Sequence, residues 1–264
     1  MLQQPSNKVA LVTGASSGIG RAFCIEHAQR GGDIVVVARN VDALKELATS
    51  LTDTYEIAVR VIDKDLSLPG AAKEIYHEVQ ATGIDVDILI NNAGFGGHGF
   101  FHERDIESDA AMIQVNLVAL TELTHLFIQD MHKRRRGKIL NVSSTASFMP
   151  GPLQAVYYAT KAYVTSFSQA IAKELEGTGI SVTALCPGAV DTGFVKAGNL
   201  EGVDLFKHAK SPASVAKIGY QGMLDNKLVV INERNLRFLI NWIVPLLPRR
   251  LVLSMSKRAM EKVA

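Results

Sequence analysis

The apolar residues of this 264-residue chain alternate between short continuous runs and longer stretches with helical spacing. The short runs, rich in Val, Ile and Leu, predict strands at 9–13, 33–38, 56–62, 86–90, 138–142, 181–185 and 228–231. The longer stretches predict helices at about 18–30, 41–51, 70–82, 105–132, 153–176 and 212–225. Strands that are apolar throughout are typical of a parallel sheet covered on both faces. The pattern therefore predicts one doubly wound α/β domain with about seven parallel strands.

Two segments depart from this alternation. Residues 187–210 form a long connection, rich in Gly and charged residues, between a strand and a helix. Loops of this length often cover binding sites. The tail, 232–264, reads as helical but contains Pro245 and Pro248, which interrupt any single long helix.

The composition excludes several classes of protein. Hydrophobic residues make up 47% of the chain, which is enough for a buried core and rules out a mostly disordered protein. The net charge of +2 gives no broad basic surface to support nucleic-acid binding. Cys24 and Cys186 are too few for a disulfide framework or a cysteine zinc site, so we expect buried thiols. Without a run of about eighteen apolar residues or a secretory signal, we expect a cytoplasmic protein with no transmembrane segment.

A glycine-rich segment joins the first strand to the first helix. Phosphate groups need close backbone approach without a Cβ atom, and they need free N–H groups at a helix N-terminus. Residues 13–20 provide both, because glycines stand where the strand turns into the helix. The sequence therefore predicts a nucleotide phosphate site at Gly14, Ser16, Ser17, Gly18, Ile19 and Gly20.

The end of the second strand indicates which nucleotide binds. An acidic residue there would hydrogen-bond the ribose 2′-hydroxyl of NAD, but this chain has Ala38 followed by Arg39. An arginine pairs with a 2′-phosphate and stacks on adenine. Arg39 therefore favours NADP(H); the alternative is a surface arginine that begins a helix.

A second group of polar residues predicts proton-transfer chemistry. Tyr157 and Lys161 share a helix face, and a nearby ammonium favours the ionised form of a phenol, which brings its pKa closer to working pH. Ser143 and Ser144 end the fifth strand, where a hydroxyl can hydrogen-bond a substrate carbonyl. Asn116 lies in an apolar helical run, where an amide is costly unless it is hydrogen-bonded; a satisfied core residue is the alternative.

These motifs together resemble those of the short-chain dehydrogenase/reductase family over about residues 8–230. The likeness rests on the glycine loop, Asp65-Leu66, Asn91-Asn92-Ala93-Gly94, Asn116, Ser144, Tyr157, Lys161 and the segment 187–192. The spacing typical of the family selects Ser144 over Ser143, because Ser144 lies thirteen residues before Tyr157.

The resemblance implies that residues 1–231 form a Rossmann-like domain that binds the dinucleotide and carries the catalytic residues. It implies that Tyr157 is the general acid of carbonyl reduction, and that Lys161 lowers its pKa and holds the nicotinamide ribose. It implies that Ser144 binds the carbonyl oxygen and that Asn116 supports a water in a proton relay. Further cofactor contacts are implied for Asp65, Leu66, Asn91, Ala93, Gly94, Pro187, Gly188, Val190 and Thr192. No metal site is implied.

NADPH-dependent carbonyl reduction, or the reverse alcohol oxidation, is therefore the leading hypothesis. An apolar ketone, aldehyde or 3-oxoacyl substrate suits Phe95, Phe100, Phe101, Phe148, Met149, Leu153 and Phe194, unless these residues only pack the loops. The end of the chain is less like the 3-oxoacyl-carrier-protein reductases than like the carbonyl reductase and 3-oxoacyl-CoA or hydroxysteroid branch. The alternatives are a non-enzymatic NADP(H)-binding sensor or scaffold and a peripheral-membrane lipid reductase. We expect a homodimer or homotetramer.

The tail, 232–264, combines strongly apolar runs with flanking basic residues. We favour a helical extension that covers the substrate pocket or lies at a subunit interface. A segment that lies on a membrane surface and a simple packed terminal helix are the two alternatives.

Overall fold

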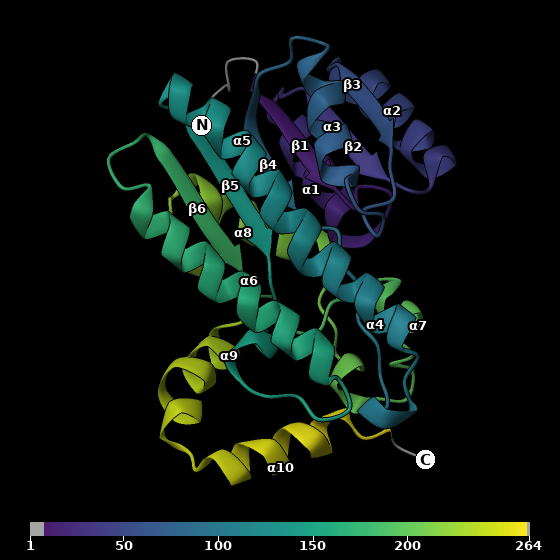
Figure 1. Cartoon of the computed structure of the whole chain (residues 1–264), viewed down its shortest axis with the longest axis vertical. Coiled ribbons are helices and arrows are strands. Elements are labelled where there is room, and N and C mark those ends of the chain that lie inside the picture. Colours follow the sequence, from purple (N-terminus) through teal and green to yellow (C-terminus); the bar gives the residue numbers. More distant parts are fainter. Residues whose placement is uncertain (1–7, 263–264) are drawn as a thin grey trace.

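The computed structural model describes residues 8–262, and its centre is a seven-stranded sheet in the order β3-β2-β1-β4-β5-β6-β7 (Figure 1). Every neighbouring pair is parallel, which confirms the predicted doubly wound sheet. The strands are β1 (Val9–Thr13), β2 (Ile34–Ala38), β3 (Val59–Asp63), β4 (Val86–Asn91), β5 (Gly137–Val142), β6 (Ile180–Leu185) and β7 (Val229–Val230).

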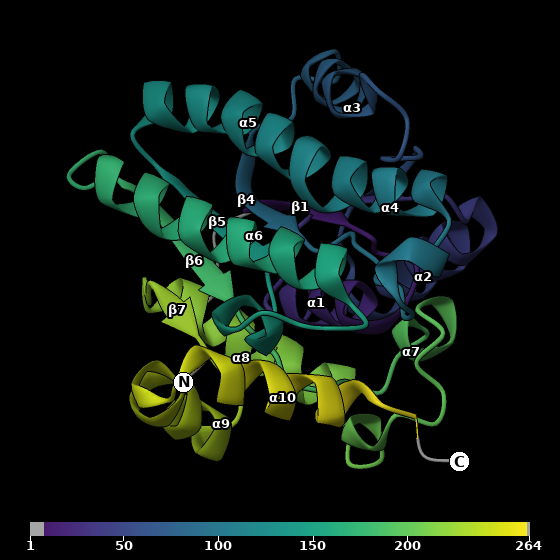
Figure 2. The ribbon, with the colours of Figure 1, turned by 60° about the horizontal axis from the view of Figure 1, so that its bottom comes forward.

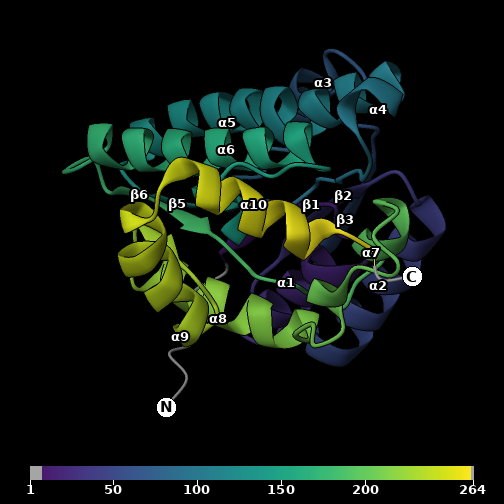
Figure 3. The same cartoon turned by 90° about the horizontal axis from the view of Figure 1, so that it is seen from below.

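Helices cover both faces of the sheet and give the molecule three layers (Figures 2 and 3). One face carries α1 (Gly18–Ala28), α2 (Val41–Tyr55) and α8 (Pro212–Leu224). The other carries α3 (Ala71–Gln80), α5 (Leu120–Arg134) and α6 (Ala155–Glu174). Alternate residues of each strand point to opposite layers, so Val12 packs beneath α1 while Leu11 packs beneath α3 and α5.

The predicted start of the third strand is wrong by three residues. The apolar spacing of Leu47 and Leu51 continues to Tyr55, so α2 runs on to that residue. Glu56 then ends the helix in the left-handed conformation, with φ of 55°. Residues 56–58 are therefore needed for the turn, and β3 begins only at Val59.

One helical run, Ile106–Arg134, is long and apolar enough to cross a membrane by length and composition, with a mean hydropathy of 1.4. It consists of α4 (Ile106–Ile113), a π-helical turn (Gln114–Ala119) and α5. Its inner side chains, among them Phe127 and Met131, are buried against the sheet and α3. An apolar helix of a protein core meets the same length and composition test.

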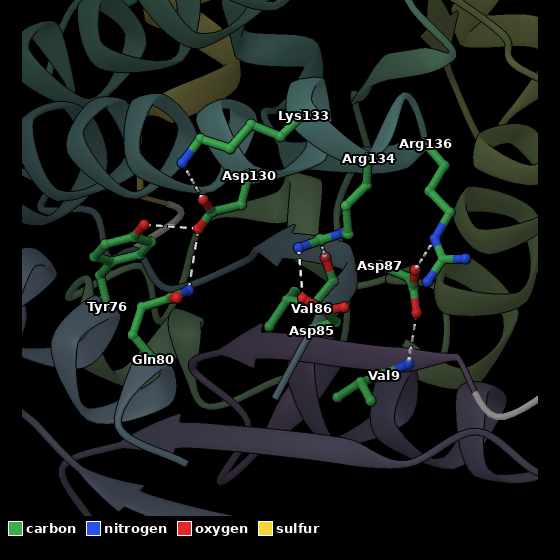
Figure 4. A network of polar contacts seen from close by, with 10 residues as sticks. All are labelled: Val9, Tyr76, Gln80, Asp85, Val86, Asp87, Asp130, Lys133, Arg134 and Arg136. Carbon is green, nitrogen blue, oxygen red and sulfur yellow. Dashed lines mark hydrogen bonds and ion pairs between the residues drawn. The ribbon is translucent and has the colours of Figure 1, made fainter. Parts of the chain in front are cut away.

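A polar network fixes the edge of the sheet at the amino ends of its strands (Figure 4). Tyr76 of α3 donates a hydrogen bond of 2.6 Å to Asp130 of α5, and this contact and burial raise its pKa to about 12. Arg134 pairs with Asp85 and also donates to the Val86 carbonyl at the start of β4. These contacts lie far from the carboxyl ends of the strands, so their effect is to hold α3 and α5 together and α5 against the start of β4.

The tail crosses the carboxyl edge of the sheet (Figures 1 and 3). It contains α9 (Arg234–Phe238), a π-helical turn (Leu239–Ile243), a 3₁₀ turn (Val244–Leu246) and α10 (Arg249–Met260). Pro245 lies in the 3₁₀ turn and Pro248 caps α10, so the prolines separate the helical pieces as predicted. Between β6 and the tail, the long connection forms α7 (Phe194–Ala197), and bonds from Lys210 to Ala189 and from Asp191 to Lys210 hold its ends together.

His27 joins three elements on the α1 side of the sheet. Its Nδ1 lies 2.6 Å from the Tyr220 hydroxyl of α8, and its Nε2 lies 3.0 Å from the Lys8 carbonyl and 3.2 Å from the Asp33 carbonyl. A neutral ring with its proton on Nε2 satisfies all three partners. Burial, the largest effect, lowers the pKa of His27.

This burial predicts a loss of stability in acid. The unfolded chain has an ordinary His pKa of about 6.5, so below that pH it binds a proton that the folded protein resists. We expect the free energy of unfolding, measured by urea denaturation, to fall as the pH drops below about 6.5. The variant His27→Gln should weaken this slope, whereas His132→Gln, at an exposed position, should keep it. An unchanged slope in His27→Gln would show that other groups cause the acid sensitivity.

Candidate active site

A cavity of about 830 Å³ opens at the carboxyl edge of the sheet. It runs from the glycine loop, past the ends of β2, β3, β4 and β5, to α6 and the tail. The strand order reverses between β1 and β4, and the crevice at such a reversal is where open α/β sheets bind ligands. The site therefore lies where the fold alone predicts it.

The glycine loop needs its glycines for two different reasons. Gly14 and Gly18 have φ of 65° and 53°, a region that favours glycine. A Cβ atom on Gly20 would instead collide with the Gly14 carbonyl oxygen. Helix α1 begins at Gly18, and the Ser17 side chain makes no capping hydrogen bond. The first N–H groups of α1 are thus available to an anion, and the loop fits a phosphate.

Most of the residues predicted from the sequence line this one cavity. They are Gly14, Ser16, Ser17, Gly18, Ile19, Arg39, Asp65, Leu66, Ala93, Gly94, Ser144, Tyr157, Lys161, Pro187, Gly188, Val190 and Thr192. Gly20, Asn91 and Asn116 do not line it. Gly20 and Asn116 lie directly behind the wall, where each contacts a lining glycine.

The side chain of Asn91 does not line the cavity. It is buried and donates to Thr124 and Asn141 at 2.9 Å each, so a contact between Asn91 and a cofactor stays a prediction. The next residue, Asn92, lines the cavity instead and donates to the Thr13 carbonyl at 2.9 Å. Asn92 belongs to the predicted motif but was not singled out as a site residue, because the sequence does not show which of the two asparagines faces the cavity.

Arg39 and Asp65 lie side by side at the ends of β2 and β3. Arg39 is exposed, and one of its guanidinium nitrogens lies 3.7 Å from the Asp65 carboxylate. Partial burial raises the pKa of Asp65, but hydrogen bonds from Ser67 and the charge of Arg39 outweigh it and leave the pKa lowered. An exposed ion pair of this length is weak, so Arg39 remains available to another anion.

Tyr157 and Lys161 lie on the buried face of α6, as their spacing predicts. The Lys161 ammonium donates to the Val142 carbonyl at 2.9 Å and lies 5.8 Å from the centre of the Tyr157 ring. Burial lowers the pKa of Lys161 to about 8. Burial also raises the pKa of Tyr157, while a hydrogen bond with Ser144 lowers it less. The pKa of Tyr157 is thus raised in this structure, opposite to the predicted downward shift, because desolvation exceeds the effect of the Ser144 hydrogen bond.

The two serines at the end of β5 have different surroundings. The Ser143 hydroxyl is buried and lies 2.9 Å from the Lys161 carbonyl and 2.6 Å from the Thr165 hydroxyl. Ser144 lines the cavity beside Tyr157, and its hydroxyl accepts from the Ala146 N–H at 3.1 Å. Both serines line the cavity, but the Ser143 hydroxyl is engaged by α6, whereas Ser144 lies beside Tyr157 and is placed to meet a ligand.

Asn116 lies on the π-helical turn between α4 and α5. Its amide donates to the Phe95 carbonyl and the Thr160 hydroxyl at 3.0 Å, and it accepts from the Phe95 N–H at 3.2 Å. A Cβ atom on Gly94 would lie 2.9 Å from the Asn116 oxygen and 3.4 Å from the Lys161 nitrogen. Asn116 therefore fixes the loop after β4 against the helix that carries Lys161, and a relay water at this residue stays a prediction.

The rest of the cavity is mainly apolar. Phe95, Met149 and Phe194 line it as predicted, but Phe100 and Phe101 are exposed and do not. The tail supplies a second apolar wall, which is formed by Leu236, Leu239, Ile240, Val244, Leu247, Val252, Met255, Ala259 and Met260. Two hydroxyls and an ammonium thus stand at one end of an apolar chamber, where they can hydrogen-bond an oxygen and pass it a proton.

Comparison with known proteins identifies a family and relatives that share this sequence pattern. The model of the family described as short chain dehydrogenase matches residues 8–201. The very-long-chain 3-oxoacyl-CoA reductase of Rattus norvegicus is 34% identical over 71% of this chain, which spans 61% of that relative's length. The 7beta-hydroxysteroid dehydrogenase of Mediterraneibacter gnavus is 28% identical over 91% of this chain and 92% of its own.

Solved structures are also similar over most of the chain. A short-chain dehydrogenase from Sphingobium yanoikuyae in complex with NADPH has a TM-score of 0.81 and 31% identity, covering 88% of this chain and 90% of that one. A structure described for 7beta-hydroxysteroid dehydrogenase stereoselectivity has a TM-score of 0.86 and 26% identity, covering 97% and 98%. The second match is long enough to include much of the tail.

The doubly wound sheet, with a cavity at its carboxyl edge, defines an α/β protein of the nucleotide-binding type of architecture. More particularly, the chain belongs to the short-chain dehydrogenase family, as the sequence resemblance implies. Its relatives named 3-oxoacyl-CoA reductase and hydroxysteroid dehydrogenase fall in the branch that the resemblance indicated.

Proposed function

We propose that this enzyme is an NADPH-dependent reductase of an apolar ketone, aldehyde or 3-oxoacyl-type compound, and that it also catalyses the reverse alcohol oxidation. The observation that carries the proposal is the meeting of Ser144, Tyr157 and Lys161 at the end of an apolar cavity that begins at the glycine loop. A non-enzymatic sensor or scaffold that only binds NADP(H) would not need these three side chains.

The cavity fits a nicotinamide dinucleotide residue by residue. The uncapped start of α1 suits the pyrophosphate, and the exposed Arg39 suits a 2′-phosphate, whose greater charge makes it a stronger partner than the Asp65 carboxylate. Leu66, Val190 and Thr192 also line the cavity, where the resemblance implies that Leu66 contacts adenine and that Val190 and Thr192 contact the nicotinamide end. The bound nicotinamide would supply the hydride, while the protein supplies orientation and proton handling.

The proton step follows from the surroundings of Tyr157. Its raised pKa keeps the phenol protonated at neutral pH, so it is a reservoir for the proton that the substrate oxygen needs. The Ser144 hydroxyl would hydrogen-bond the same oxygen and hold it beside the Tyr157 hydroxyl. The Lys161 ammonium, charged below a pKa of about 8, would stabilise the tyrosinate left after transfer.

The apolar lining supports an apolar substrate, and the printed names of the relatives, 3-oxoacyl-CoA reductase and hydroxysteroid dehydrogenase, agree with one. The tail would act as the cover of this substrate pocket, because its inner side chains form one wall. A cytoplasmic location and a homodimer or homotetramer stay predictions from the sequence.

The variant Tyr157→Phe tests the reaction. It removes the hydroxyl that gives up the proton, so NADPH oxidation with ketones, aldehydes and 3-oxoacyl thioesters should fall by at least about a hundredfold. NADPH binding, measured by fluorescence titration, should stay nearly intact. Tyr163→Phe on an exposed part of the same helix is the matched control and should keep its activity. Activity retained in Tyr157→Phe would overturn the assignment.

The variant Arg39→Asp tests the cofactor. It replaces the partner of the 2′-phosphate with a repelling charge, so the ratio of kcat/KM for NADPH over NADH should fall by about a hundredfold. Arg21→Asp, on α1 but outside the cavity wall, controls for a general change of charge. An unchanged ratio in Arg39→Asp would show that Arg39 does not bind the 2′-phosphate.

A specific observation favours a second candidate, a reductase that works at a membrane surface. The outer side of the tail exposes large apolar side chains, with Trp242 66% and Leu246 82% exposed. Basic residues flank them, namely Arg234, Arg237, Arg249, Arg250, Lys257, Arg258 and Lys262. Exposed tryptophan with basic neighbours is typical of segments that lie on anionic lipid. The inner side of the tail lines the cavity, so a lipid substrate would have a short path from the membrane surface into the cavity.

Trp242 is the single tryptophan of the chain, so its fluorescence tests this candidate directly. We expect its emission to shift to the blue with phosphatidylcholine vesicles that contain phosphatidylglycerol, and less with phosphatidylcholine alone. Leu246→Glu should weaken the shift, whereas Leu68→Glu, exposed on another part of the surface, should not. A shift that appears without vesicles as protein concentration rises would point to self-association instead.

A further inference from the structure

Three polar side chains interrupt the apolar wall of the cavity. Gln154 and Tyr158 come from the start of α6, and Ser256 comes from α10 of the tail. All three are at least nine-tenths buried, with Gln154 only 3% and Ser256 only 5% exposed. None has a part in the proton chemistry proposed above, so their presence in an apolar wall needs its own explanation.

Two of these side chains lack partners within the described residues. Gln154 Nε2 and Ser256 Oγ are both buried and make no hydrogen bond of acceptable geometry. Burial raises the pKa of the neighbouring Tyr158, and the Ser256 hydroxyl is close enough to lower it in part. Buried polar atoms in native proteins are nearly always paired, and unpaired ones in a binding cavity point to a ligand group.

The backbone holds this cluster in place. Leu153, just before Gln154, has φ of 67°, a rare conformation for a residue with a side chain, and its carbonyl accepts from the Gly99 N–H at 2.9 Å. The Tyr158 N–H donates to the Gln154 carbonyl at 3.0 Å. Gly151 packs on the Tyr158 ring so closely that a Cβ atom there would collide with it. The orientation of the cluster is thus fixed before a ligand arrives.

We propose that Gln154, Tyr158 and Ser256 form a second polar subsite, which binds an oxygen function of the substrate other than the reacting carbonyl. The Tyr158 ring lies 6.2 Å from the Tyr157 ring, so the subsite is separate from the proton donor but within the same cavity. An amide and two hydroxyls are uncharged, so they suit a neutral hydroxyl or carbonyl rather than a carboxylate.

The subsite rests on the proposed function, because it selects among carbonyl substrates. An amide and hydroxyls buried in a pocket disfavour any ligand that leaves them unpaired. The enzyme would therefore prefer an apolar ketone that also carries a hydroxyl or second carbonyl over one with a single oxygen. Because Ser256 belongs to α10, the tail would contribute a specificity residue as well as an apolar cover.

The test compares a medium-chain methyl ketone with a series of its hydroxy derivatives, in which the hydroxyl moves stepwise away from the carbonyl. At the best position, the wild type should show a kcat/KM about tenfold above that of the parent ketone. Gln154→Met and Ser256→Ala should each reduce this ratio toward one, mainly through KM. Gln169→Met on α6 and Ser254→Ala on α10 lie outside the cavity wall and should keep the ratio.

Thermal unfolding separates binding from a structural role. Because the Gln154 amide lacks a partner, Gln154→Met should keep or raise the melting temperature, whereas a structural residue would lower it. The same ketone series is measured by ligand-induced thermal shift in Tyr157→Phe, which reports binding without turnover. A hydroxyl preference in that shift supports the subsite even if no ketone is reduced. Equal binding of all the ketones, or an unchanged ratio in Gln154→Met, would overturn the subsite alone.

Discussion

The burial of the Lys161 ammonium beside Tyr157 is the constraint on which the site depends. A buried charge is costly unless polar groups surround it, and here the Val142 carbonyl at the end of β5 accepts its hydrogen bond. That carbonyl is available because the strand ends there, and Ser143 holds the Lys161 backbone in register with the strand. Gly94 must lack a side chain chiefly because a Cβ atom there would come within 2.9 Å of the Asn116 oxygen. The end of β5 and the first half of α6 are therefore held together by one buried charge.

The tail covers a part of the cavity that the three layers of helices and sheet leave exposed. Helices cover the faces of the sheet, but not the carboxyl edge where the cavity lies (Figure 3). A substrate bound there would face water on one side, and apolar binding would be weak. The inner residues of the tail supply the missing wall, and the bond between His98 and the Met260 carbonyl, at 2.7 Å, fastens its end.

The strands and the shared helix face of Tyr157 and Lys161 were predictable because they depend on short-range patterns. Apolar runs set the strands, and the separation of Tyr157 and Lys161 by one helical turn placed both on one face. Other features of the site depend on the three-dimensional surroundings of each side chain, namely its direction and its burial. Asn91 and Asn92 are neighbours with opposite directions, and the pattern does not say which one faces the cavity. The sign of the Tyr157 pKa shift likewise follows from desolvation. Gln154 carries no sequence signal, because only its lack of a partner makes it notable.

The boundary of the matched family region has an evolutionary consequence. The family model ends at residue 201, so the phosphate loop, Ser144, Tyr157 and Lys161 lie within it, whereas the tail wall lies beyond it. Mutations in the tail can reshape the apolar wall of the cavity without changing Ser144, Tyr157 or Lys161. Under the proposed function, selection can therefore change the substrate range in small steps while the proposed chemistry stays intact, and an engineer could exchange the same segment between relatives for the same reason.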